Sequence, residues 1–212
     1  MITAKEVLVL VLALIILVFS NSFKNILEKD TSFTINSLFI FAIILIIYVA
    51  AKKLTAYYYE AEEETKIWNF QRYGLYERSY FKYPIPIGII LPFLLSIITF
   101  GSIPWFAVTE SDVKPTEARA AKRHQIYSFA EMTEWHLALI SASGILASLI
   151  IAPIAYILNL QELAKASIYF ACFNLLPLGK LDGSRVFFGS LILWVFLAAI
   201  SLIALSYALL LV

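Results

Sequence analysis

The chain has 212 residues, of which 61% are hydrophobic and 15% are charged, and its formal net charge is +1. Soluble domains are roughly 45–50% apolar and about 25% charged, so a water-soluble globule is excluded because too little polar surface is available to cover the apolar mass. The near-neutral charge excludes a nucleic-acid-binding protein that works through a basic surface. The composition therefore predicts an integral membrane protein whose first partner is the lipid bilayer.

Six apolar runs approach the roughly 20 residues that a helix needs to cross a bilayer. They lie at about 4–23, 36–53, 85–108, 136–158, 166–178 and 186–212. No repeat or Gly/Ser linker divides them, so we expect one all-α polytopic membrane domain over 1–212, a bundle of five to six transmembrane helices. The first run carries Lys5 before its apolar core and is expected to be an uncleaved anchor without a buried charge, although a cleaved signal peptide has a similar pattern.

Two charged segments connect the runs. Segment 52–83 is rich in tyrosine, which is typical of an aromatic belt at the membrane surface. Its acidic stretch from Glu60 to Glu64, followed by Lys66, is expected to be a solvated helical face. Segment 109–135 is also polar, and the spacing over 115–129 is compatible with a helix.

The third run, 85–108, is interrupted by helix-breaking residues. It contains Pro86, Gly88, Pro92, Gly101 and Pro104. Proline inside a helix removes a hydrogen bond and clashes with the preceding turn, and broken backbone at membrane depth requires shielding by protein or a water-filled cavity. The run is therefore either a kinked spanning helix or a re-entrant segment.

The most specific stretch lies between the last two runs, from Asn174 to Arg185. Pro177 is expected to interrupt the helix, and Gly183 allows the chain to turn tightly behind Asp182. A carboxylate at the edge of the bilayer is costly and is a functional candidate by default. The alternative is a polar turn in which Asp182 caps the final helix.

The pattern Asn-x-x-Pro, then three residues, Leu-Asp-Gly, a small residue and Arg resembles the second signature of the site-2 protease family. These are intramembrane zinc metalloproteases, also called M50 peptidases. The resemblance implies that Asp182 corresponds to a zinc ligand and that Asn174 lies near the active site. Segment 143–148 resembles the family's Gly-Pro-x-Ala-Asn element, with Ile145 and Ser148 in place of Pro and Asn. The resemblance covers about 38–185.

The first signature of that family, His-Glu-x-x-His, is absent. On a helix this spacing places two imidazoles on one face to bind zinc, with the glutamate as general base. The chain has two histidines, His124 and His136, and both follow the second run. The register of that run places Tyr48, Val49 and Lys52 at the equivalent positions. We therefore expect no catalytic residues and no zinc cofactor.

A zinc site rebuilt from other residues is the alternative. His136 and Asp182, with a glutamate such as Glu134 or Glu131, would supply three ligands, and Asn174 would complete the site. We expect instead that Trp135 and His136 anchor the start of a span and that the glutamates are solvated. Two further residues near His136, Ser141 and Ser143, are interpreted as helix-packing residues.

Charge placement separates the two topologies. If all six runs cross, the 16 basic residues divide equally between the two sides. If 85–108 is re-entrant, 13 lie on one side and 3, Lys24, Lys29 and Lys165, on the other, which satisfies the positive-inside rule. We therefore favour five spans with the amino terminus in the cytoplasm of a cell-membrane protein and the carboxyl terminus outside.

These observations predict a catalytically inactive site-2 protease-like membrane protein that binds a transmembrane helix of a partner or acts as a scaffold. The groove for that helix is predicted to be lined by small and polar residues: Ser143, Gly144, Ser148, Asn174, Pro177, Asp182 and Gly183. The alternatives are an active zinc metallopeptidase with atypical ligands, which cleaves membrane-anchored substrates, and an anchor or transport subunit of a membrane complex. The near absence of charge within the runs argues against transport.

Overall fold

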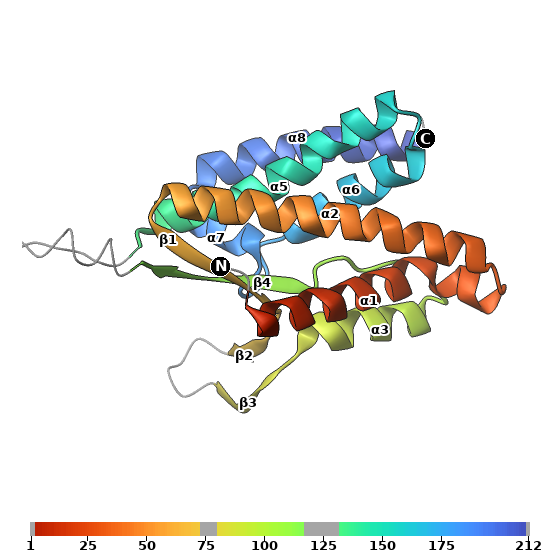
Figure 1. Ribbon diagram of the computed structural model, residues 1–212, viewed down its shortest axis with the longest axis horizontal. Coiled ribbons are helices and arrows are strands. Elements are labelled where there is room, and N and C mark those ends of the chain that lie inside the picture. Colours follow the sequence, from red (N-terminus) through yellow and green to blue (C-terminus); the bar gives the residue numbers. More distant parts are fainter. Residues whose placement is uncertain (1–2, 73–79, 117–131, 211–212) are drawn as a thin grey trace, which may run out of the picture.

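Long apolar helices dominate the computed structural model, which describes residues 3–72, 80–116 and 132–210 (Figure 1). Four helices in these ranges are long and apolar enough to cross a membrane: α1 (Ala4–Leu27), α2 (Thr31–Tyr58), α5 (Glu134–Ile157) and α8 (Leu191–Leu210). The expected helical membrane protein is confirmed at this level. Most of the helix expected within 115–129 lies outside the described residues.

Local sequence explains where the long helices begin and turn. Thr3 and Asp30 accept hydrogen bonds from backbone N–H groups in the first turns of α1 and α2, and Thr133 does the same for α5. Between α1 and α2, Lys29 has φ of 59°, and between α5 and α6, Asn159 has φ of 60°. Such left-handed residues terminate helices and allow the chain to reverse.

The helices at the other apolar runs differ in their bounds from those predicted. Run 85–108 contains α3 (Ile87–Ile98), run 166–178 overlaps α6 (Gln161–Asn174), and run 186–212 is divided between α7 (Asp182–Gly189) and α8. At a rise of 1.5 Å per residue, the 12 residues of α3 extend about 18 Å, which is less than the ~30 Å hydrocarbon thickness of a bilayer.

Four short strands are also present in the described ranges, which the all-α prediction did not include. β1 (Ala61–Ile67) pairs antiparallel with β4 (Thr109–Pro115), and β2 (Phe70–Arg72) pairs with β3 (Tyr80–Ile85). The solvated helical face predicted for the acidic stretch is therefore wrong. β1 alternates buried and exposed side chains, as a strand must.

The helices and strands define two ends of the molecule, visible in Figure 1. The strand end holds β1–β4, the start of α1 and the end of α2, while the turn end holds the α1–α2 and α5–α6 connections. The segment containing α3 leaves and returns to the strand end. Gly88 N–H donates to Trp68 O there, Gly101 approaches Lys24 at the turn end, and Trp68 N–H donates to Val108 O on return.

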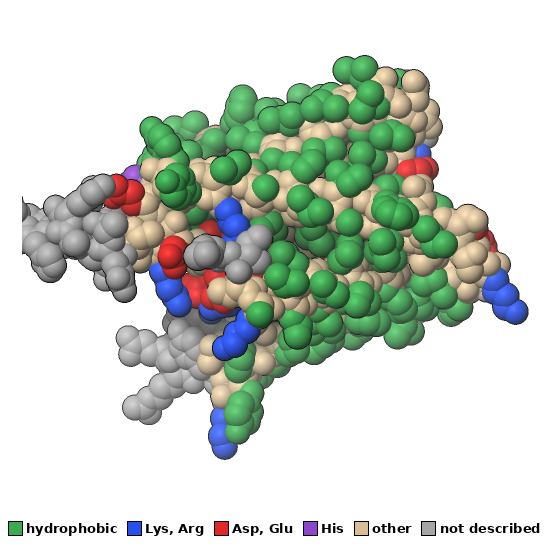
Figure 2. All heavy atoms as spheres, viewed as in Figure 1, with side chains coloured by type: hydrophobic (Ala, Val, Ile, Leu, Met, Phe, Trp, Pro, Cys, Tyr) green, Lys and Arg blue, Asp and Glu red, His purple; other side chains and the backbone are tan. Residues whose placement is uncertain are grey.

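α5 lies at the centre of the bundle, packed against α2, α6 and α7. The main core is formed by apolar side chains from α1, α2, α5 and α6, including Leu17, Phe41, Ile44, Ile145 and Phe170. In Figure 2, apolar side chains cover the length of the helices and charged side chains gather toward the two ends. This distribution is the one expected of a membrane-spanning bundle.

Candidate functional site

Asp182 begins α7 and is fully buried where this helix meets α2 and α5. The Tyr48 hydroxyl donates to Asp182 Oδ2, and Lys52 Nζ lies 3.2 Å from the same oxygen. The Ser141 hydroxyl donates to the other oxygen, Oδ1, at 3.1 Å. Both carboxylate oxygens are therefore engaged by side chains from the two long helices.

Lys52 is also fully buried, and its ammonium group contacts more than Asp182. It donates to Ser111 Oγ at 2.8 Å, lies 3.5 Å from Glu63 Oε1, and sits 4.3 Å from the centroid of the Tyr48 ring. Lysine is an ammonium at neutral pH, and two buried carboxylates with surrounding oxygens and an aromatic ring provide the compensation that a desolvated charge requires.

A second ion pair adjoins the first. Lys53 Nζ lies 2.7 Å from Glu6 Oε1 and 3.7 Å from Glu63 Oε2, and Glu6 and Glu63 are buried. On the other side, Arg185 donates to Ser111 O. We call this set the buried charge cluster; its three cations balance its three carboxylates: Lys52, Lys53, Arg185, Glu6, Glu63 and Asp182.

Helix geometry and two glycines bring the cluster together. Tyr48 and Lys52 are four residues apart and lie on one face of α2. A Cβ at Gly144 of α5 would lie 2.8 Å from Tyr48 Cε2 and 2.9 Å from Lys52 Cγ, so only glycine permits this approach. A Cβ at Gly183 would lie 2.1 Å from Leu175 O, so the turn before α7 also requires glycine.

Several residues of the predicted partner groove make contacts within the chain. Gly144 is covered by α2 of the same chain, Ser143 and Ser148 donate to backbone carbonyls of their own helix, and Gly183 packs on the preceding turn. Gly144, Ser148 and Gly183 are therefore buried within the chain, and Ser143 is half-buried. Pro177 follows α6 in the connection to α7, as expected for a helix-terminating residue.

Asn174 ends α6 and is fully buried, as the resemblance implies for a residue near the site. Its Nδ2 donates to Phe170 O at 2.9 Å and approaches Phe106 O at 3.5 Å. Its Oδ1 is buried and has no hydrogen-bond partner among the described residues. The amide thus joins α6 to the extended chain that returns from α3.

The alternative metal ligands do not assemble. His136 lies at the start of α5, where it contacts the Thr133 hydroxyl and the Tyr59 ring. Within the described ranges, no three His, Cys, Asp or Glu side chains are grouped so that they could hold a metal ion. Glu131 and His124 lie outside those ranges.

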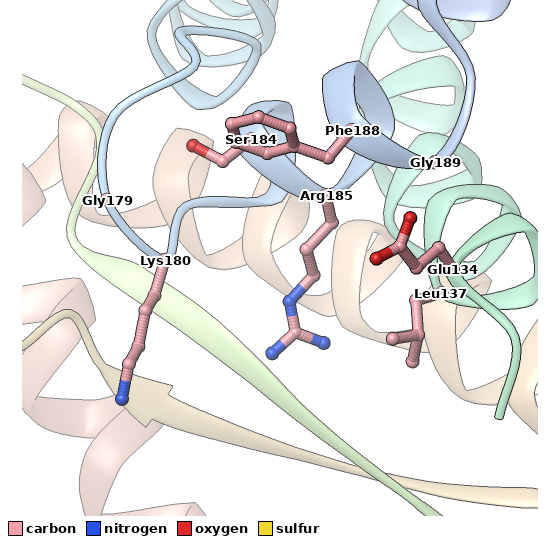
Figure 3. A pocket seen from close by; sticks show the side chains of 8 residues that line it. All are labelled: Glu134, Leu137, Gly179, Lys180, Ser184, Arg185, Phe188 and Gly189. Carbon is pink, nitrogen blue, oxygen red and sulfur yellow. The ribbon is translucent and has the colours of Figure 1, made fainter. Parts of the chain in front are cut away.

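Glu134 instead lines a small cavity of about 230 Å³ beside α7. Figure 3 shows Glu134 and Arg185 on two walls of this cavity, one from α5 and one from α7, while Lys180 extends away from the loop that precedes α7. Glu134 is exposed, and the cavity contains neither Asp182 nor His136. The predicted catalytic set of Asp182, Asn174, His136 and Glu134 is therefore divided among separate surroundings.

The side chains around Asp182 do not fit zinc, the metal that the resemblance implies. Zinc binds deprotonated or neutral donors, whereas a lysine ammonium has no lone pair to offer and repels a cation. The Lys52–Ser111 pair resembles a serine–lysine hydrolase pair in distance alone, because a lysine base must be neutral and Lys52 has two carboxylates within 3.5 Å. The arrangement places one cation between two buried carboxylates.

Four members of this site were missed or misread from the sequence. Ser141, interpreted as a packing residue, binds Asp182, and Ser111 was not singled out. Glu63, expected on a solvated face, and Glu6, in a run expected to hold no buried charge, are both buried. The spacing of Ser141 and Gly144, one turn apart, could have indicated that Ser141 faces α2. No family model, curated protein or solved structure matches this chain.

Proposed function

We propose that this chain is a non-catalytic integral membrane protein with a site-2 protease-like arrangement, which holds a partner's transmembrane helix or acts as a membrane scaffold. The observation that carries the proposal is the contact of Tyr48 and Lys52 with Asp182. These are the positions that the resemblance equates with the two histidines and the aspartate of the zinc site.

The ammonium of Lys52 supplies the positive charge that Asp182 would otherwise receive from a metal ion. A buried carboxylate without a counter-charge is strongly destabilising, so loss of metal ligands from such a core requires a replacement cation. Lysine at the second position of the pair and tyrosine at the first meet this requirement with one charge and one hydrogen-bond donor. The helices of the core then remain packed around Asp182 without a catalytic metal site.

We propose the re-entrant topology for the membrane segments, with the strand end in the cytoplasm and the carboxyl terminus outside a cell membrane. α3 is short, and its segment returns to the strand end. The basic residues support the same orientation. Lys24, Lys29 and Lys165 lie at the turn end, and the other described basic residues lie on the strands, at the ends of α1 and α2 near them, or around α7.

Metal analysis of purified full-length protein tests the absence of catalysis. We expect no stoichiometric zinc and no chelator-sensitive cleavage of a membrane-anchored model substrate. The double variant Tyr48→His/Lys52→His places two imidazoles next to Asp182, and their side chains are shorter than the tyrosine and lysine that they replace. This variant is expected to bind zinc, and the further substitution Asp182→Ala is expected to abolish that binding. Stoichiometric zinc in the unmodified chain, removed by Asp182→Ala, would overturn the proposal.

Photocrosslinking tests the helix-binding role. α8 presents many exposed apolar side chains, and Ile192 is 85% exposed. A photoreactive residue at position 192 is expected to yield one discrete crosslinked membrane polypeptide in native membranes, while the same residue at Lys114, on β4, is not. Crosslinks only to lipid at position 192 would contradict a partner helix on this face.

A further inference from the structure

A groove of about 530 Å³ lies at the turn end between α5, α6 and α8, away from the buried charge cluster. Its walls are almost entirely apolar, from Leu149 to Ile157 on α5 and from Ile200 to Ala208 on α8. Pro153 lines it and interrupts the hydrogen bonding of α5. Water does not fill apolar cavities of this kind, so in a bilayer the groove is filled by hydrocarbon or by protein.

Polar groups of the groove gather at its outer end. Tyr156 and Tyr207, near the last residues of α5 and α8, contact each other edge to face at 5.4 Å. Lys165, near the start of α6, lines the same end and is partly buried. Tyrosine and lysine in such positions lie at the headgroup level of a membrane. The groove thus matches an amphiphile whose chain points toward the middle of the helices.

The volume of the groove distinguishes a lipid acyl chain from a partner helix as its occupant. One turn of a helix about 10 Å wide and 5.4 Å long fills roughly 400 Å³, so the groove accommodates little more than a single turn of a partner helix. A single acyl chain is thin and flexible, and it can fill the space along α5 and α8. The lysine adds charge complementarity to an anionic headgroup, since basic residues near the surface attract anionic lipid.

We propose that this groove binds one acyl chain of an anionic glycerophospholipid, with Lys165 next to the phosphate and the two tyrosines at the level of the glycerol. The inference is independent of whether the protein is catalytic. It assigns to the turn end a lipid site that has no residue in common with the cluster around Asp182.

Native mass spectrometry of the full chain tests the headgroup preference. The protein is titrated in detergent with phosphatidylglycerol and with phosphatidylcholine of identical acyl chains. We expect phosphatidylglycerol to bind about fivefold more tightly, the ratio that corresponds to ~1 kcal/mol per basic residue. Lys165→Gln removes this preference, whereas Lys24→Gln, an exposed lysine at the same end, keeps it. Equal binding of both lipids by the unmodified chain overturns the proposal.

Photoreactive lipid tests the location of the site, first in the unmodified chain. Phosphatidylglycerol with a diazirine at successive positions along its acyl chain is incorporated into vesicles with the protein. We expect crosslinked peptides from 149–157, 164–168 and 200–208, and a severalfold loss of these crosslinks in Ala204→Leu, which fills the groove. Crosslinks spread evenly over all helices indicate annular lipid only and overturn the site, as does a co-purified polypeptide that protects these peptides from labelling.

Discussion

At the scale of single residues, the buried charge cluster is held by mutual compensation. Asp182 accepts three hydrogen bonds or ion contacts and Lys52 meets two carboxylates, all with no exposure to solvent. An intact buried pair contributes little net stability, but removal of one partner leaves an uncompensated charge in a medium of low dielectric constant. Single substitutions in the cluster are therefore expected to cost far more than paired ones.

Lys52→Ala is expected to destabilise the protein by about 3–5 kcal/mol, because Asp182 and Glu63 lose their shared cation. The matched substitution Lys66→Ala, at a lysine 40% exposed beside Asp112, is expected to cost less than about 1 kcal/mol. Thermal unfolding in detergent measures both. The double variant Lys52→Met/Asp182→Asn is expected to recover part of the loss, and strict additivity of its two single changes would contradict the coupling.

The contributions of two β4 carboxylates to folding stability are expected to change with pH in opposite directions. Burial raises the pKa of Glu110, although the Asn69 N–H and nearby basic groups oppose it. Its ionised form is therefore unfavourable in the folded state, so stability contributed by the protonated group is lost as pH rises through the folded pKa. Glu110→Gln is expected to raise the melting temperature at pH 7, and the gain is expected to vanish below about pH 4, where glutamate is protonated in both states.

Asp112 provides the matched control. The hydrogen bond from Lys66 lowers its pKa despite partial burial. Its contribution to stability is therefore present at neutral pH and is lost as pH falls through the lowered folded pKa. Asp112→Asn is expected to lower the free energy of unfolding at pH 7 by less than about 1 kcal/mol, because the pair is partly exposed, and to lower the melting temperature slightly. A higher melting temperature of Asp112→Asn at pH 7 would contradict the expected stabilising contribution of ionised Asp112.

Part of the site could be predicted from sequence at this scale. The Leu-Asp-Gly motif singled out Asp182, and the register of the second run singled out Tyr48 and Lys52. Ser111 and Glu63 could not be found in the same way. They reach Lys52 only through the pairing of β1 with β4, residues about 50 positions apart, and neither lies in a recognisable pattern.

At the scale of elements, the strands show where local propensity is overridden. Glutamate favours helix over strand, so the stretch Glu62–Glu64 predicts a helix when it is read alone. Its antiparallel partner, β4, satisfies the backbone, while Glu6 accepts from Thr65 N–H and Arg185 donates to Ser111 O. Non-local hydrogen bonds and burial of Glu63 against two lysines therefore decide the conformation. The long helices were predictable because an uninterrupted apolar run of this length by itself indicates a membrane-spanning helix.

The α2–α5 contact depends on Gly144. Gly144→Ala places a methyl group within 3 Å of Tyr48 and Lys52, so the helices must separate at a cost of about 1–3 kcal/mol. Ser143→Ala, next to it on α5, loses only a bond to its own helix and is expected to be nearly neutral. Thermal unfolding of both variants measures the difference. Equal stability of the two variants would mean that the glycine is not needed for this approach.

At the scale of the whole molecule, the two ends differ in charge and in chain path, and this predicts sidedness. In a Cys172→Ser background, cysteines at Lys66 and Lys114 are expected to react with a membrane-impermeant reagent from one face only. Cysteines at Lys29 and Asn159 are expected to react from the opposite face. Labelling of Lys66 and Lys114 from opposite faces would rule out a re-entrant segment between β1 and β4, which pair with each other.

The separation of Lys52 from Asp182 along the chain has a consequence for biogenesis. When α2 enters the membrane during synthesis, the carboxylate that it contacts in the folded state is 130 residues from being made. A lysine costs about 2.5–3.5 kcal/mol at the centre of an inserting helix, and the cost is lower toward the end of the helix, where Lys52 lies. Glu63 follows within the next few turns of chain and also reaches Lys52, so it can serve as the first counterion. We expect Glu63 to compensate Lys52 until α7 is translated and Asp182 becomes the second counterion.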